Sequence, residues 1–210
     1  LGWTVSDIGN PAEPGYCFAR HPDSIHLRCG GKTIWQEADT FTFVHRRVTG
    51  DFDVRVQLAR LDFVHSSTRA GLMLRENLTP GSRNVFVGTY PINATKKWVA
   101  TCRTESNGTS SLAPGRSYIT RSETFDFPNA WVRLKRFGNT ITAYYSTDGT
   151  SWHQLGKQLV LSDAFPETVH LGMAAVAAVD SPGVATIAEF RHFSNFASGN
   201  PAQIVLHGED

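Results

Sequence analysis

The stretch 131–153, WVRLKRFGNTITAYYSTDGTSWH, decides the fold because it contains two residue pairs that are typical of tight β-hairpin turns. Gly138-Asn139 and Asp148-Gly149 both suit primed two-residue turns, whose twist matches that of the paired strands. The stretch therefore predicts two consecutive antiparallel hairpins.

Two-residue turns also fix which residues face each other across the hairpins. The expected core pairs are Val132 with Tyr145, Leu134 with Ala143, and Tyr145 with Trp152. The opposite face is polar and is expected to point to solvent; it carries Arg133, Lys135, Thr142, Tyr144 and His153.

The same period of two recurs along the chain, whereas helical periodicity is almost missing. In residues 51–63 the apolar positions Phe52, Val54, Val56 and Leu58 alternate with polar ones. Further strand candidates are residues 24–29, 39–48, 69–76, 84–90, 97–103, 168–175 and 184–193. We predict an all-β, two-sheet antiparallel β-sandwich of jelly-roll type. It forms one domain over residues 1–196, followed by a tail or linker at 197–210.

Composition excludes several classes of protein. Of the 210 residues 40% are hydrophobic, which excludes disorder for most of the chain. Twenty Lys and Arg against 19 Asp and Glu give a net charge of +1, which makes nucleic acid an unexpected partner. The longest apolar run, 171–179, is about half of what a bilayer requires, so no membrane insertion is expected.

Three cysteines are too few for a disulfide scaffold, and no C-x-x-C spacing indicates a zinc or redox centre. If one disulfide forms, Cys17 with Cys29 is the favoured pair. The alternative is three buried thiols that pack as small hydrophobes. The chain starts at Leu1 without a secretion signal, so we expect that any signal was removed or lies upstream in a longer parent chain.

Motifs spread over residues 3–196 resemble concanavalin A-like lectin/glucanase jelly rolls, in particular secreted domains grouped with the regulation-of-enolase-like proteins. The matching segments are Trp3 with Asp7-Ile8-Gly9, Ile34-Trp35 with Asp39-x-Phe41-x-Phe43, Gly50-Asp51-Phe52, AGLMLRE at 70–76, Trp131-Val132-Arg133-Leu134, the 146–152 hairpin and Leu171-Gly172. The resemblance implies a sandwich with a concave face and a secreted, cell-surface or periplasmic location. Relatives commonly act as carbohydrate-binding or accessory modules beside glycan-degrading enzymes, so the other domains of a parent chain are expected partners.

Catalytic motifs are weak. Retaining jelly-roll glucanases place two carboxylates on alternate residues of one strand, and Asp51-Phe52-Asp53 is the nearest analogue here. Ser24-Ile25-His26 faintly matches the Q-I-H signature of polysaccharide lyases. Catalysis by Asp51, Asp53 or His26 with Arg75, as a glycoside hydrolase or polysaccharide lyase, is therefore an alternative and not the main prediction.

Two arginines are candidate sugar contacts. Arg75 and Arg103 would line the concave sheet and donate bidentate hydrogen bonds to hydroxyls or to a uronate carboxylate. The competing interpretation is an internal ion pair, Arg75 with Asp39 or Glu76 with Arg103.

Sugar rings also stack on aromatic planes. Tyr90 and Trp98 flank the loop 91–97 and are the best candidates, followed by Trp35. Trp3, Trp131 and Trp152 are assigned to packing.

Related jelly rolls often hold structural Ca²⁺ between a loop carboxylate and backbone carbonyls, which would make Asp7, Asp39 and Glu189 ligands here. The sequence as a whole predicts a non-catalytic module that binds a polysaccharide or oligosaccharide. The alternatives are the hydrolase or lyase named above and a protein-interaction domain.

Overall fold

The computed structural model describes residues 2–92, 95–114 and 125–196, with the backbone alone for 90–92, 95 and 96. Its strands are β1 (Thr4–Ile8), β2 (Tyr16–Phe18), β3 (Ser24–Cys29), β4 (Phe41–Thr49), β5 (Phe52–Leu61), β6 (Arg69–Arg75), β7 (Asn84–Ile92), β8 (Thr95–Arg103), β9 (Ser111–Leu112), β10 (Ala130–Phe137), β11 (Thr140–Ser146), β12 (His153–Gln154), β13 (Leu159–Val160), β14 (Thr168–Val176) and β15 (Thr186–Asn195).

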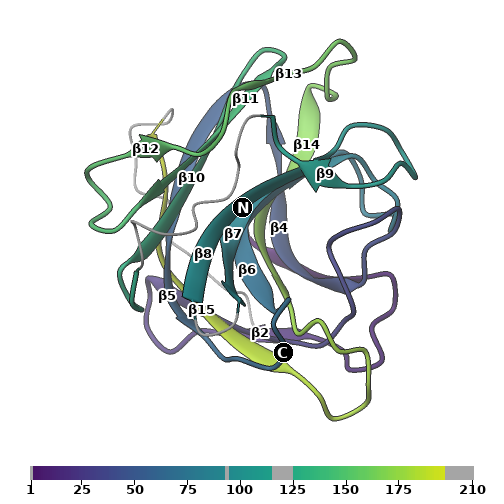
Figure 1. The fold of residues 1–210 in the computed structure, drawn as a ribbon, viewed down its shortest axis with the longest axis vertical. Coiled ribbons are helices and arrows are strands. Elements are labelled where there is room, and N and C mark those ends of the chain that lie inside the picture. Colours follow the sequence, from purple (N-terminus) through teal and green to yellow (C-terminus); the bar gives the residue numbers. More distant parts are fainter. Residues whose placement is uncertain (1, 93–94, 115–124, 197–210) are drawn as a thin grey trace.

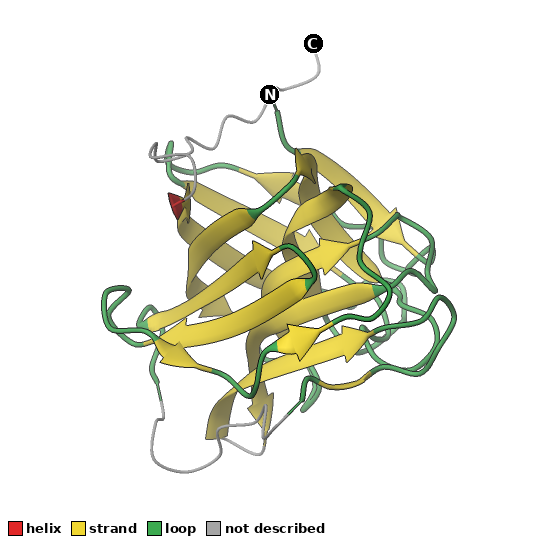
Figure 2. Ribbon diagram, turned by 90° about the horizontal axis from the view of Figure 1, so that it is seen from above, coloured by secondary structure: helices red, strands yellow, loops and turns green. Residues whose placement is uncertain are grey.

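The strands form two antiparallel sheets that pack face to face (Figures 1 and 2). One sheet has the order β1-β4-β14-β6-β7-β8-β9, and the other has the order β12-β11-β10-β5-β15-β3-β2, with β13 also paired to β11. The prediction of an all-β, two-sheet antiparallel sandwich is confirmed. The sandwich runs to Phe196, and the predicted tail at 197–210 lies outside the described residues.

Alternating side chains of both sheets fill the space between them. From the eight-stranded sheet come Val54, Val56, Leu134 and others, and from the seven-stranded sheet Leu72, Leu74 and Val87, all buried in one cluster. Period-two alternation produces this core because every second side chain of a strand points to the same face.

The outer face of the seven-stranded sheet is also covered. A second apolar cluster there joins Phe41, Phe43, Met73 and Phe86 to Ile34, which comes from the segment before β4. Loops therefore cover a face that alternation alone would leave open to solvent.

The first predicted hairpin is confirmed in register. Val132 pairs with Tyr145 and Leu134 with Ala143, and the turn at Gly138 has φ +55°. The predicted polar face is found for Arg133, Lys135, Thr142 and Tyr144, which pair with one another on the outer side of the sheet. The prediction is wrong for His153, which pairs with Tyr145 and stacks on its ring.

The second predicted hairpin is wrong by one residue. Tyr145 pairs with His153 and not with Trp152, because β11 ends at Ser146 and β12 begins only at His153. Side chains stabilise this longer loop: the Gly149 amide donates to Ser146 Oγ at 2.9 Å, and the Thr150 and Ser151 amides donate to Asp148 Oδ1. The shift places Trp152 on the outer face, where its ring meets the Arg133 guanidinium, instead of in the core.

Of the two alternatives for the cysteines, a Cys17–Cys29 disulfide and unpaired thiols, the structure has the second. All three cysteines are free thiols, and Cys17 pairs across the sheet with Leu27 while Cys29 lies in the core. Burial raises the pKa of the Cys29 thiol. Within the described part of the chain, no helix is long and apolar enough to cross a membrane.

Candidate functional site

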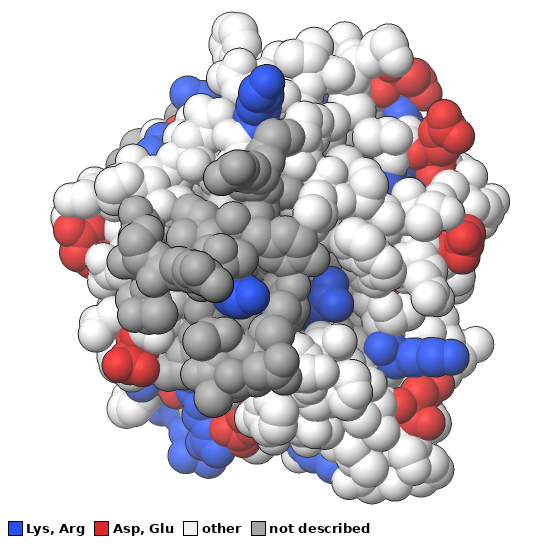
Figure 3. Space-filling view, in the orientation of Figure 1, with Lys and Arg blue, Asp and Glu red and all other residues white. Residues whose placement is uncertain are grey.

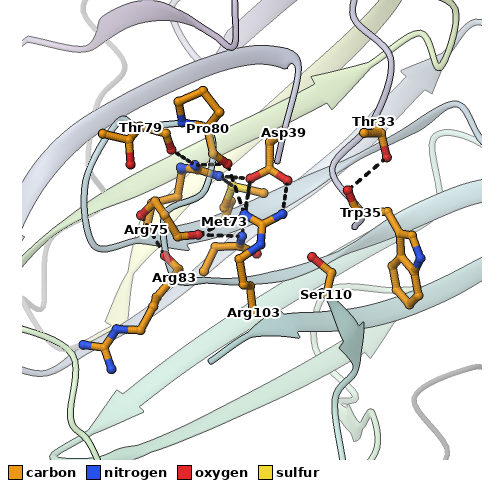
Figure 4. Close-up of polar contacts among 12 residues, drawn as sticks. Thr33, Trp35, Asp39, Met73, Arg75, Thr79, Pro80, Arg83, Arg103 and Ser110 are labelled. Atoms are coloured by element: carbon orange, nitrogen blue, oxygen red, sulfur yellow. Dashed lines mark hydrogen bonds and ion pairs between the residues drawn. The ribbon is translucent and has the colours of Figure 1, made fainter. Parts of the chain in front are cut away.

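Arg75 and Arg103 lie on the outer face of the seven-stranded sheet, two strands apart, and both point at Asp39 (Figure 4). Arg103 donates to Asp39 Oδ1 at 2.7 Å and to Oδ2 at 2.9 Å, and Arg75 donates to Oδ2. All three side chains are 0% exposed.

The same guanidinium groups hold the covering loops in place. Arg103 donates to the carbonyl oxygens of Gln36 and Gly108, and Arg75 donates to that of Thr79 at 2.6 Å. Arg75 and Arg103 thus donate hydrogen bonds to backbone carbonyl oxygens of three loops. Without these hydrogen bonds, the buried carbonyl groups would have no partner.

This burial corrects the prediction that Arg75 and Arg103 contact a sugar, because neither guanidinium reaches the surface. The competing interpretation is right for Arg75 and Asp39. It is wrong for Glu76, which pairs with Arg83 at 2.8 Å instead of with Arg103.

The three aromatic residues predicted to contact a sugar differ in their exposure to solvent. Trp98 is 0% exposed between Phe125 and Tyr145, with ring centroids 4.2 and 4.8 Å away, so the prediction that it binds a ligand is wrong. Tyr90 has its backbone in β7, but its side chain lies outside the described residues. Trp35 is partly exposed, with its indole turned away from Asp39 (Figure 4).

The three carboxylates predicted to bind calcium do not form one site. Asp7 accepts hydrogen bonds from Thr42 Oγ1 and the Gly15 amide, Asp39 faces the two arginines, and Glu189 pairs with Arg191 on the other sheet. In the described parts of the chain no three His, Cys, Asp or Glu residues converge as metal ligands would. The three carboxylates therefore do not act together as ligands of one ion.

The candidate catalytic groups are engaged separately. Asp53 forms a bidentate pair with Arg133, with both oxygens at 2.6 Å from a guanidinium nitrogen, while Asp51 accepts from the Gly138 amide. His26 is buried and stacks on Phe18, with Nε2 3.7 Å from Glu189. Neither arrangement presents a pair of free carboxylates to a substrate.

The outer face of the eight-stranded sheet carries a groove of about 260 Å³ that the predicted site did not include. We call it the aromatic groove; its lining residues are Lys135, Phe137, Thr140, Thr142, Tyr144 and Gln158. The β10–β11 hairpin supplies all of them except Gln158, which precedes β13.

Strand register sets the order of groups along the groove. Phe137 pairs with Thr140, Lys135 with Thr142, and Arg133 with Tyr144. Phe137 and Tyr144 therefore lie at its two ends, about 13 Å apart along the strand, with hydroxyl and ammonium groups between them. The Phe137 ring is 73% exposed, which is unusual for a large apolar side chain on a strand.

Arg133 orients the aromatic side chains at the Tyr144 end. Its guanidinium carbon lies 5.1 Å from the Tyr144 ring centroid and 5.6 Å from that of Trp152. The hydrogen bond to Asp53 raises the pKa of Arg133, so the cation that holds both rings stays charged. The rings are thus held in place before any ligand arrives.

Solved structures with a similar fold are known, although no protein-family model and no curated protein sequence matches the chain. A functionally unknown protein from Saccharomyces cerevisiae superposes with a TM-score of 0.66 at 16% identity, over 92% of this chain and 95% of that one. The GH43 protein BlXynB from Bacillus licheniformis superposes with a TM-score of 0.57 at 16% identity, over 81% of this chain and 32% of that one. A GH43B protein of a Bacteroides ovatus xyloglucan PUL gives 0.53 at 13% identity, over 83% of this chain and 33% of that one.

These likenesses establish the fold. The β-sandwich matches the yeast protein over nearly its whole length but spans only about a third of the GH43 chains.

The face of the molecule shown in Figure 3 carries charges of both signs. In the view of Figure 3, outside the grey atoms, Lys and Arg are interspersed with Asp and Glu around the rim. The aromatic groove has the exposed Phe137 ring at one end, the partly exposed Tyr144 ring at the other and polar groups between them, and it is the candidate functional site.

Proposed function

We propose that this chain is a non-catalytic carbohydrate-binding module that holds a polysaccharide in the aromatic groove. Pyranose rings have apolar C–H faces that pack on aromatic planes and hydroxyl groups that need polar partners. Phe137 and Tyr144 supply the planes, and Lys135 and Thr142 supply hydrogen bonds between them. This arrangement is the observation that carries the proposal.

The comparisons support the same role at a coarser level. Several of the similar chains are GH43 proteins, and one is described as a xylan beta-1,4-xylosidase from Bacillus halodurans. Because the β-sandwich covers about a third of such chains, it is the size of a module joined to a larger glycan-processing protein. Secretion, a multidomain parent chain and kinship with the regulation-of-enolase-like proteins are parts of this proposal.

The test is retention of the purified chain on xylan, xyloglucan, a uronate-containing polysaccharide and a sulfated one, with product release measured in the same tubes and after chelation of calcium. We expect retention on a neutral polysaccharide, no products and no effect of chelation. Sustained product release would instead support a hydrolase or lyase, and a blank on every glycan would favour a protein partner.

Variants locate the site. Removing a ring that covers about 60 Å² of apolar ligand surface costs about 1.5 kcal/mol, or about tenfold in Kd. Tyr144→Ala and Phe137→Ala should each weaken binding by about this factor. Tyr16→Ala is the matched control, since Tyr16 is 53% exposed on β2, at the opposite edge of the same sheet. Equal losses in all three variants would refute the assignment.

A further inference from the structure

A second pocket, of about 420 Å³, lies at the edge of the seven-stranded sheet. Thr4, the first residue of β1, pairs with His45, so β4 runs on past β1 through Arg46 and Arg47. The polar and charged lining residues are Thr4, His45, Arg46, Arg47, His170 and Asn195. No Asp or Glu is among the described residues that line the pocket.

Neither arginine of the pocket pairs with a carboxylate of the residues that the structure describes. The Arg46 guanidinium is half-buried against two rings, 5.0 Å from the centroid of Trp3 and 5.4 Å from that of Phe193. Burial lowers the pKa of Arg46, as expected for a cation that no acid compensates. Arg47 is exposed and has no hydrogen-bond or ion-pair partner within the described part of the chain.

The two histidines that line the pocket belong to a hydrogen-bonded chain of three side chains. Ser6 Oγ lies 3.0 Å from His45 Nε2, and His45 Nδ1 lies 3.1 Å from His170 Nδ1. His45 is buried and stacks on Phe43, whereas His170 is partly exposed. Both nitrogens of His45 and Nδ1 of His170 are engaged, which leaves Nε2 of His170 for a ligand.

Positive charge flanks His170 on both neighbouring strands. His170 pairs across the sheet with Arg47 of β4 on one side and with Arg75 of β6 on the other. The other cationic or titratable groups around it are His45 and Arg46 of β4. Burial lowers the pKa of His170, and Arg47 and Arg75 lower it further. The carboxylate of Asp39 pairs with Arg75 and Arg103 and does not contact His170.

We propose that this pocket binds an oxyanion, the carboxylate, sulfate or phosphate group of an acidic ligand, through Arg47 and Nε2 of His170. Arginine and histidine side chains donate charge-assisted hydrogen bonds to such groups, and the uncompensated cations favour an anion at this place. The volume has room for one sugar-sized ring beside the charged group. The inference is independent of the aromatic groove, which lies on the other sheet.

The histidine chain makes this binding depend on pH. When His45 Nδ1–H donates to His170 Nδ1, the proton of neutral His170 lies on Nε2, and Ser6 Oγ–H donates to His45 Nε2. When His170 takes a second proton, its Nδ1–H donates to His45 Nδ1, and His45 Nε2–H donates to Ser6 Oγ. Nε2 of His170 donates in both states, and the cationic state binds an anion more strongly. Affinity therefore rises as pH falls through the pKa of His170.

The test is a titration of the whole chain, in EDTA, followed by NMR of the histidine ring and arginine side-chain signals at pH 5.5, 6.5 and 7.5. The probes are glucuronate, glucose 6-sulfate, glucose 6-phosphate and inorganic phosphate, with glucose as the neutral control. We expect all acidic probes to shift the His170 signals. Glucuronate and glucose 6-sulfate, whose charge is constant over this range, should bind more tightly at pH 5.5 than at pH 7.5. The ranking of the probes identifies the source of the oxyanion.

Arg47→Gln should weaken binding at least fivefold, and His170→Gln should abolish the pH dependence. Lys32→Gln, which removes one exposed positive charge elsewhere, should change neither. Equal weakening by Lys32→Gln, binding of glucose as strong as that of glucuronate, or no shift at any pH would overturn the proposal. Tyr144→Ala should leave oxyanion binding unchanged, so failure at the aromatic groove is distinguishable from failure here.

Discussion

Replacing Asp39 by Asn tests whether the arginine network is a structural element of the fold. The substitution keeps the shape of the side chain but removes the charge that faces Arg75 and Arg103, both 0% exposed. Removing one partner of a buried ion pair costs about 3–5 kcal/mol, because the remaining charge stays buried without compensation. In a domain of this size the melting temperature should then fall by about 6–20 °C.

Urea unfolding followed by tryptophan fluorescence measures this loss, provided that the slope against denaturant stays constant. Asp62→Asn is the matched control, since Asp62 pairs with Arg60 through side chains that are largely exposed, and it should cost less than about 1 kcal/mol. A loss for Asp39→Asn no larger than that of Asp62→Asn would refute the structural role. Such a result would return the two arginines to consideration as ligand contacts.

Three further predictions follow from burial. Trp98→Ala should lower the free energy of unfolding, measured in urea, by about 3–5 kcal/mol, whereas Phe137→Ala should change it by less than about 0.5 kcal/mol. A loss for Trp98→Ala as small as that for Phe137→Ala would place Trp98 outside the core. Burial and neighbouring positive charge lower the pKa of His45 to about 4 in the folded protein. As the pH falls, His45 therefore takes up a proton in the unfolded chain before it does so in the folded one. The free energy of unfolding should fall by about 2–3 kcal/mol between pH 7 and pH 4.5. His45→Gln should lose that part of the pH dependence, and an unchanged profile would contradict the assignment. Native Cys29 should resist a thiol reagent, and all three cysteines should react after unfolding without reduction; a pair that stays unreactive would reveal a disulfide.

Alternation along the strands was sufficient to predict the sandwich and the outward position of Tyr144 and Lys135. The first hairpin could be placed in register because Gly138-Asn139 forms a two-residue turn. The second could not, because Ser146 and Asp148 bind backbone amides and lengthen the loop, and this moved Trp152 from the expected core to the outer face.

The site residues were harder to predict because their surroundings come from distant parts of the chain. Arg75 and Arg103 occupy outward positions, as alternation requires, but loops that carry Gln36 and Thr79 fold over them and remove them from solvent. His45 and His170 are 125 residues apart in sequence and meet only because β4 pairs with β14. The alternation of apolar and polar residues predicts which face of the sheet a side chain lies on. It does not predict which loops or other side chains cover that face.

The most direct test of the central claim is an amide NMR titration of the chain with a xylan or xyloglucan oligosaccharide. Binding in the aromatic groove predicts saturable shifts at Lys135, Phe137, Thr142, Tyr144 and Gln158, with little change in the strands around Arg75 and Arg103. Shifts confined to the seven-stranded sheet, or no shifts with any neutral oligosaccharide, would contradict the claim that the groove is the glycan-binding site.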